Sequence, residues 1–95
     1  MESKLFTPVT FGPLTLRNRT IRSAAFESMC PGNAPSDMLL DYHRSVAAGG
    51  ISMTTVAYAA VTQSGLSFDR QLWMRPEIIP GLRKLTDAIH AEGAA

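Results

Sequence analysis

The chain has 95 residues, a formal net charge of +1, and an ordinary composition with 45% hydrophobic and 18% charged residues. This length allows at most one small domain, since domains usually contain about 100 to 150 residues. The near-neutral charge gives no basis for binding nucleic acid or an anionic membrane, because counterion-release binding needs several clustered cations. Three arginines, Arg17, Arg19 and Arg22, lie close together, and we interpret them as solvated or salt-bridged side chains at a strand end.

No segment predicts secretion or membrane insertion. The first four residues are followed by no apolar signal region. Glycine, threonine or serine interrupts every apolar stretch well short of the roughly 18 residues of a membrane span. The single cysteine, Cys30, cannot form an internal disulfide and suits a reducing compartment. We therefore expect a soluble, cytoplasmic protein.

The first predicted element is a hairpin. Two short β-favouring runs, residues 8–11 and 14–16, are joined by Gly12 and Pro13, a pair typical of a tight turn. Residues 19–24 are short and partly apolar, and predict a first buried strand. Two prolines, a glycine and an asparagine indicate a loop over residues 27–35.

A helix is predicted to follow this loop. Ser36 is a suitable N-cap, and the charge of Asp37 in the first turn complements the helix dipole. Apolar side chains recur at spacings of three and four residues, at Leu39, Tyr42 and Val46. Gly49 and Gly50 are the expected end of the helix.

The second half of the sequence repeats this alternation. Residues 51–56 are rich in β-branched side chains and predict a second strand, followed by a long loop to about residue 75. A last helix is predicted from Pro76 or Pro80 to Gly93, with one apolar side formed by Ile78, Leu82, Leu85 and Ile89. The order hairpin, β, α, β, α predicts an α/β fold with parallel strands.

Catalytic motifs are sparse in this sequence. It contains no C-x-x-C, H-E-x-x-H or P-loop pattern, so we assign no metal site and no catalytic residue. His43 and His90 fall in predicted helices, and we interpret both as surface or packing residues. The small residues Ala24, Ala25 and Ala57 follow the two predicted strands, where a planar ring could approach the backbone. The residues alone leave open that these alanines only reflect tight packing.

Several segments, in one order and spacing, resemble the Old Yellow Enzyme family of NADH:flavin oxidoreductases, and its 2,4-dienoyl-CoA reductase-like members in particular. These segments are Leu-Phe-Thr-Pro at 5–8, Leu-Arg-Asn-Arg at 16–19, Ala-Gly-Gly at 48–50, Gln-Leu-Trp at 71–73 with Ile-Pro-Gly-Leu at 79–82, and His-Ala-Glu-Gly-Ala at 90–94. The resemblance implies a partial (β/α)8 TIM barrel, made of the N-terminal hairpin plus the first two βα units. Residues 1–95 would then be an incomplete FMN-dependent oxidoreductase domain, since a whole barrel needs roughly 250 residues.

The resemblance also implies a cofactor and a reaction. FMN would accept hydride from the co-substrate NAD(P)H and pass it to a small-molecule activated alkene. By position, the cofactor-binding residues fall on Ser23, Ala24, Ala25 and Phe26 after the first strand, and on Ala57 and Tyr58 after the second. Phe26 departs from the threonine or cysteine that tunes the flavin in many members, and Ala24 replaces a frequent proline. Tyr58 replaces a small residue, so its side chain should point away from the ring, or the backbone alone should make the contact.

Two functional readings follow. In the first, residues 1–95 are the N-terminal part of such an enzyme and are inactive alone, because the family's later flavin-, substrate- and phosphate-binding residues would lie beyond Ala95. In the second, the chain is a non-catalytic barrel remnant that self-associates or is completed by a C-terminal half. An open sheet should leave Ile51, Met53, Leu82 and Ile89 in water, which favours association.

Overall fold

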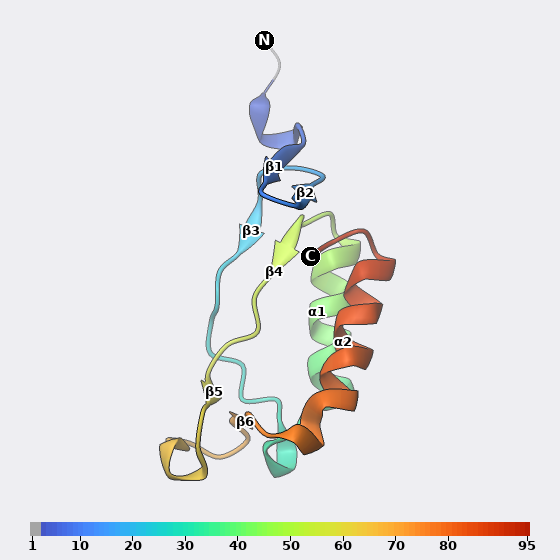
Figure 1. The fold of residues 1–95 in the computed structure, drawn as a ribbon. Helices are drawn as coiled ribbons and strands as arrows, with labels where there is room; N and C mark the ends of the chain where they lie inside the picture. The colour runs from blue at the N-terminus through green and yellow to red at the C-terminus, as the bar shows by residue number, and fades with distance from the viewer. Residues whose placement is uncertain (1–2) are drawn as a thin grey trace.

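The computed structural model describes residues 3–95, which form two helices and three two-stranded sheets without closing a barrel (Figure 1). The strands are β1 (Val9–Phe11), β2 (Leu14–Leu16), β3 (Ile21–Arg22), β4 (Met53–Thr54), β5 (Ala59–Ala60) and β6 (Leu72–Trp73). The helices are α1 (Asp37–Ala48) and α2 (Ile79–Ala91), which pack side by side next to β4. The molecule is elongated, with extents of 51 × 24 × 22 Å.

The predicted hairpin is confirmed. β1 pairs with β2 antiparallel, with Val9 opposite Leu16 and Phe11 opposite Leu14. Gly12 lies in the turn at φ +55, a conformation that glycine adopts without the steric cost of a Cβ atom.

The predicted parallel pairing of the next two strands is also confirmed. β3 and β4 are parallel, with Ile21 opposite Met53, and α1 connects them. Ala95 pairs with the other edge of this unit: its N–H donates to the Ser52 carbonyl and its carbonyl accepts from the Thr54 N–H, each at 2.8 Å. The β4 segment therefore has hydrogen-bonded neighbours on both sides.

The region predicted as one long loop contains a further strand pair, which corrects that prediction. β5 and β6 are parallel, with Ala59 opposite Leu72, and the Met74 N–H donates to the Ala60 carbonyl at 2.8 Å. Each strand has only two residues, and alanine is depleted in strands. Local propensity therefore gives no signal for β5, and the pairing depends on tertiary contacts.

Both helices begin near the predicted positions. The Ser36 hydroxyl accepts from the Leu39 N–H at 3.1 Å, which confirms the N-cap of α1. A 3-10 turn at Pro76–Ile78 leads directly into α2. Among residues 3–95, neither helix has the length and apolarity needed to cross a membrane.

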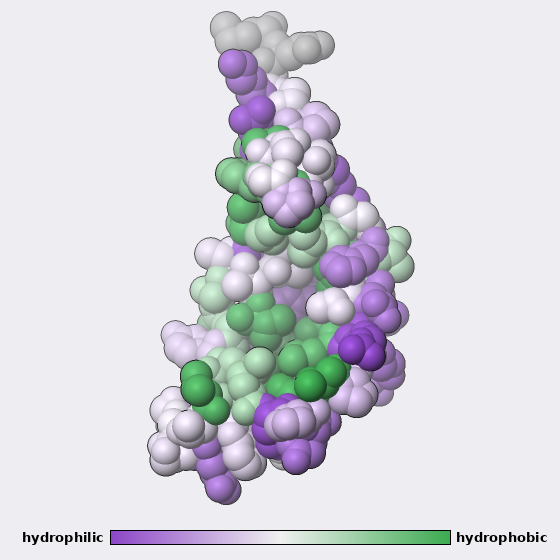
Figure 2. Space-filling model, in the orientation of Figure 1, coloured by the Kyte–Doolittle hydropathy of each residue, from purple (hydrophilic) through white to green (hydrophobic). Residues whose placement is uncertain are grey.

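The core lies between the two helices. Its largest buried members come from α1, α2 and the segments before them, and are Leu39, Leu40, Leu72, Ile78, Leu85 and Ile89. Ile89 is only 4% exposed, so the expectation that it lies in water is wrong. The apolar side of α1 covers it, whereas Ile51, Met53 and Leu82 are half-buried. Figure 2 shows that apolar surface remains on the face between the helices and the extended segments.

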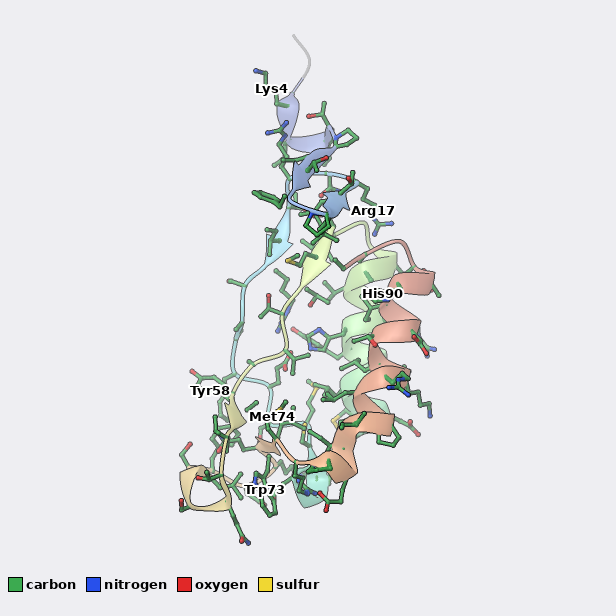
Figure 3. The ribbon with its side chains drawn as sticks, viewed as in Figure 1. Lys4, Arg17, Tyr58, Trp73, Met74 and His90 are labelled. Carbon is green, nitrogen blue, oxygen red and sulfur yellow. The ribbon has the colours of Figure 1, made fainter. Side chains whose placement is uncertain are left out.

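Arg17 joins the hairpin to the ends of both helices (Figure 3). Its Nη1 donates to the Glu92 carbonyl at 2.7 Å, just after α2, and its Nη2 donates to the Ala47 carbonyl of α1 at 2.6 Å. A third bond, at 2.9 Å, reaches the Ile51 carbonyl before β4. Positive side chains at helix C-termini satisfy unpaired carbonyls and complement the helix dipole.

We expect Arg17→Met to lower the free energy of unfolding by about 2 kcal/mol, because it removes three charge-assisted hydrogen bonds to carbonyl groups. Urea unfolding followed by circular dichroism measures this change. The matched control is Arg19→Met, since the hydrogen bonds of the Arg19 side chain go to Thr7 and Pro8, both in the N-terminal region and away from the helix ends. Equal losses in the two variants would contradict the role assigned to Arg17.

Candidate functional site

The segments that follow β3 and β4 meet at one end of the parallel pair. The rings of Phe26 and Tyr58 lie edge to face, with their centroids 5.8 Å apart. The Ala57 N–H donates to the Glu27 carboxylate at 3.2 Å. The segments after the two strands therefore meet at the C-terminal end of the parallel pair, and we call this edge, formed by residues 23–26 and 57–58, the rim.

The structure distinguishes the predicted site residues by exposure. Ser23, Ala24, Ala25 and Phe26 are all exposed, whereas Ala57 is buried and its N–H is occupied by Glu27. Within residues 3–95, the amides of Ala24 and Ala25 have no hydrogen-bond partner. These two amides, next to small side chains, are available to bond the polar edge of a planar ligand.

An aromatic cluster of Phe26, Tyr58 and Phe68 borders the rim. Phe68 lies 4.8 Å from Phe26 and 5.7 Å from Tyr58, measured between ring centroids. Tyr58 stays 55% exposed and has a φ of +53, a left-handed conformation that costs a non-glycine residue about 1 kcal/mol or more. Figure 3 places Tyr58 beside β5, far from Arg17. The sequence analysis missed Phe68, because it lies in the segment predicted to be a loop.

Behind the rim lies a buried charged cluster made of Arg22, Glu27 and His43. Glu27 Oε2 is 2.7 Å from His43 Nε2 and 3.2 Å from an Arg22 nitrogen. The three side chains are 13%, 4% and 1% exposed in the order Arg22, Glu27, His43. The separation of Glu27 Oε2 and His43 Nε2 is of hydrogen-bond length, although neither atom has a partner in ideal hydrogen-bond geometry.

His43 is a packing residue, but a polar one. Its Nδ1 lies 2.7 Å from the Thr54 hydroxyl, which links α1 to β4. Burial lowers the pKa of His43; the Glu27 carboxylate opposes this shift and Arg22 adds to it. His90, by contrast, is exposed. Both histidines line a cavity of about 70 Å³ between the two helices and β4. Among residues 3–95, no three potential metal-binding side chains come together.

The sequence analysis did not assign a role to Glu27. A signal was present, since His43 follows Leu39 and Leu40 by four and three residues and so shares their buried helix face. A histidine on such a face needs a polar partner, and Glu27 is the acidic residue next to the first strand. Spacing alone could not show that the two meet.

Cys30 lies in the same core, only 4% exposed. Burial raises the pKa of its thiol, and the nearby Glu27 carboxylate raises it further. Because the thiolate is the reactive form, both effects make Cys30 a poor nucleophile.

Comparison with known proteins identifies the same family throughout. A model of the NADH:flavin oxidoreductase / NADH oxidase family matches residues 4–95. The chain is 52% identical over 90 residues to 4,4'-dithiodibutanoate disulfide reductase of Rhodococcus erythropolis, which aligns 95% of this chain with 22% of that protein. It is 32% identical over 96 residues to an NADPH dehydrogenase of Listeria monocytogenes, covering 97% of this chain and 28% of the relative.

A solved structure gives the same result for the fold. A complex of 2-naphthoyl-CoA reductase with 2-naphthoyl-CoA matches 96% of this chain with a TM-score of 0.90 and 29% identity. The match covers 14% of that protein. The chain thus spans less than a third of the length of each of these relatives.

We expect stability to decline below neutral pH because of His43. Its pKa is lower in the folded chain than the value of 6.5 for an unperturbed histidine, so the unfolded chain takes up the proton first as pH falls. The contribution is complete above about pH 6.5 and is lost as pH falls toward the folded pKa. Urea unfolding across this range should show a smaller slope of stability against pH in His43→Gln than in the wild-type chain. A wild-type stability that is flat with pH would contradict this.

We expect the Cys30 thiol to react with Ellman's reagent at least about tenfold more slowly in the native chain than in urea, because it is buried with a raised pKa. The absorbance of the released thiolate measures both rates. As the sequence has a single cysteine, the signal has only one source. Equal rates in the two conditions would show that the thiol is accessible in the folded chain.

Proposed function

The chain belongs to the NADH:flavin oxidoreductase / NADH oxidase family, and we propose that it forms one side of the active site of an FMN-dependent NAD(P)H oxidoreductase of the ene-reductase type. The observation that carries the proposal is the meeting of the segments after β3 and β4 at one rim. Ligands of (β/α)8 barrels bind at this end of the strands. The architecture we propose is a partial barrel, extended from the edge of β4 where Ala95 already pairs.

The residues of this chain would bind and orient the flavin rather than react. Bound FMN would supply hydride transfer between NAD(P)H and the substrate. The free amides of Ala24 and Ala25 would donate to the polar edge of the ring, and the small side chains allow close approach. Phe26 and Tyr58 would exclude water beside it. Because position 26 carries no hydroxyl or thiol, its side chain would not hydrogen-bond the ring.

An activated alkene is the substrate class we propose. A disulfide is a second candidate, because the Rhodococcus relative with 52% identity is named for reducing one. The single cysteine argues against thiol–disulfide exchange at this part of the site, since Cys30 is buried and burial raises its pKa. Reduction of a disulfide would then depend on the flavin and not on Cys30.

The alternative proposal is a non-catalytic barrel remnant that associates with itself or with a C-terminal half. Exposed apolar side chains favour it, including Phe26 at 63% and Val61 at 82% exposure. Purification separates the two proposals. A chain that retains the visible absorbance of flavin supports the oxidoreductase, and a colourless oligomer supports the interaction module.

We expect the 95-residue chain alone not to oxidise NADH in the presence of added FMN and cyclohexenone. Efficient transfer requires donor, flavin and acceptor within near-attack distance, and two βα units provide only one side of the ring. The absorbance of NADH follows the reaction, with free FMN and no protein as the control. Turnover above this control would show that self-assembly or a partner completes the site, and would overturn the expectation.

A further inference from the structure

A buried carboxylate holds the two segments of the rim together. Glu27 is only 4% exposed, and its two oxygens have different partners. Oε2 faces the interior, where Arg22 and His43 lie within 3.2 and 2.7 Å. Oε1 accepts the N–H of Ala57 at 3.2 Å, from the segment that follows β4. Burying a charge costs several kcal/mol unless it is paired, so a glutamate retained here needs these partners.

The interior partners fix the carboxylate from two different elements. Arg22 ends β3 and also donates to the Thr55 carbonyl at 3.0 Å and to the Tyr42 hydroxyl at 3.2 Å. His43 belongs to α1 and contacts Thr54 of β4. The orientation of the Glu27 carboxylate is therefore fixed relative to α1, β3 and β4, independently of its contact with Ala57.

The hydrogen bond between Glu27 and Ala57 acts on the rim because each of these two residues is next in sequence to an aromatic residue of the rim. Phe26 precedes Glu27, and Tyr58 follows Ala57. The hydrogen bond between Glu27 and Ala57 thus sets the distance between Phe26 and Tyr58, whose ring centroids are 5.8 Å apart. It also holds the segment in which Tyr58 keeps its left-handed φ of +53, a conformation that persists only where the surroundings impose it.

We propose that Glu27 is the positioning residue of this rim: oriented by Arg22 and His43, it fixes the Ala57–Tyr58 segment against the Ser23–Phe26 segment. The proposal rests on the proposed function in that these two segments are the ones assigned to the flavin. Glu27 itself contacts no part of the exposed rim surface, so it acts through the backbone that it holds.

The test compares two substitutions at one position in the 95-residue chain. Glu27→Gln keeps an oxygen acceptor for the Ala57 N–H, whereas Glu27→Met has similar volume and no acceptor. Two NMR readouts need no flavin: the hydrogen-exchange protection of the Ala57 amide, and the nuclear Overhauser contact between the Phe26 and Tyr58 rings. We expect Glu27→Met to lose both and Glu27→Gln to retain both. Glu77→Gln is the control, since that carboxylate is 73% exposed and its ion-pair partner is Arg75.

A third readout is the apparent affinity for FMN, measured by quenching of flavin fluorescence. We expect Glu27→Met to weaken it about tenfold, because the Ala57–Tyr58 segment is no longer held in place for binding, and Glu27→Gln to weaken it less than about threefold. A folded Glu27→Met chain that keeps the ring contact, the amide protection and the affinity would overturn the proposal. If Glu27→Met does not fold, a folded Glu27→Gln chain that loses the protection of the Ala57 amide but keeps the ring contact would overturn it.

The two proposals fail in different ways. If the wild-type chain does not quench FMN fluorescence, flavin binding by this chain alone is refuted, while the two NMR readouts still decide the role of Glu27. If the wild-type chain binds FMN and all variants bind it equally, the flavin proposal stands and the positioning role is refuted.

Discussion

The arrangement of this chain depends on one guanidinium group. Arg17 bonds the carbonyls of Ala47, Ile51 and Glu92, which end α1, precede β4 and follow α2. The three carbonyls lie in α1, in the segment before β4 and in the segment after α2. Arg17 therefore fixes the positions of both helices and of β4 relative to one another. The alignment of the two rim segments at the opposite end of β3 and β4 also depends on Arg17, because a ladder of two residues on each strand could not fix it alone.

A second arginine has a comparable role at the far end. Arg75 donates to the carbonyls of Asn33 and Trp73 at 2.7 and 3.0 Å, and its guanidinium stacks 4.5 Å from the centre of the Trp73 ring. These contacts join the loop before α1 to the segment before α2. Arginine suits both places because its planar fork can bond several carbonyls at once. Polar capping at each end thus supports a small core that lies mainly between the helices.

The sequence predicted features that depend on local chemistry and missed those that depend on distant contacts. Turn glycine, the Ser36 cap and helical periodicity are local signals, and the hairpin and both helices followed from them. The proximity of the two rim segments could be expected from their positions directly after two parallel strands. The β5–β6 pair, the partners of Arg17 and the meeting of Glu27 with His43 could not be predicted, since each joins residues with no shared pattern. Whether the rim residues hold FMN stays a prediction.

Gly93 has a consequence for how sequences of this family can vary. It lies at φ +85, and a Cβ atom built there would stand 2.7 Å from Nη1 of Arg17. Any side chain at position 93 would therefore displace the guanidinium from the end of α2. The two positions, 76 residues apart, should change together during evolution: where an alignment of relatives shows arginine at the first, it should show glycine at the second. Loss of Arg17 would remove this steric constraint at position 93 but not the preference of its positive φ for glycine.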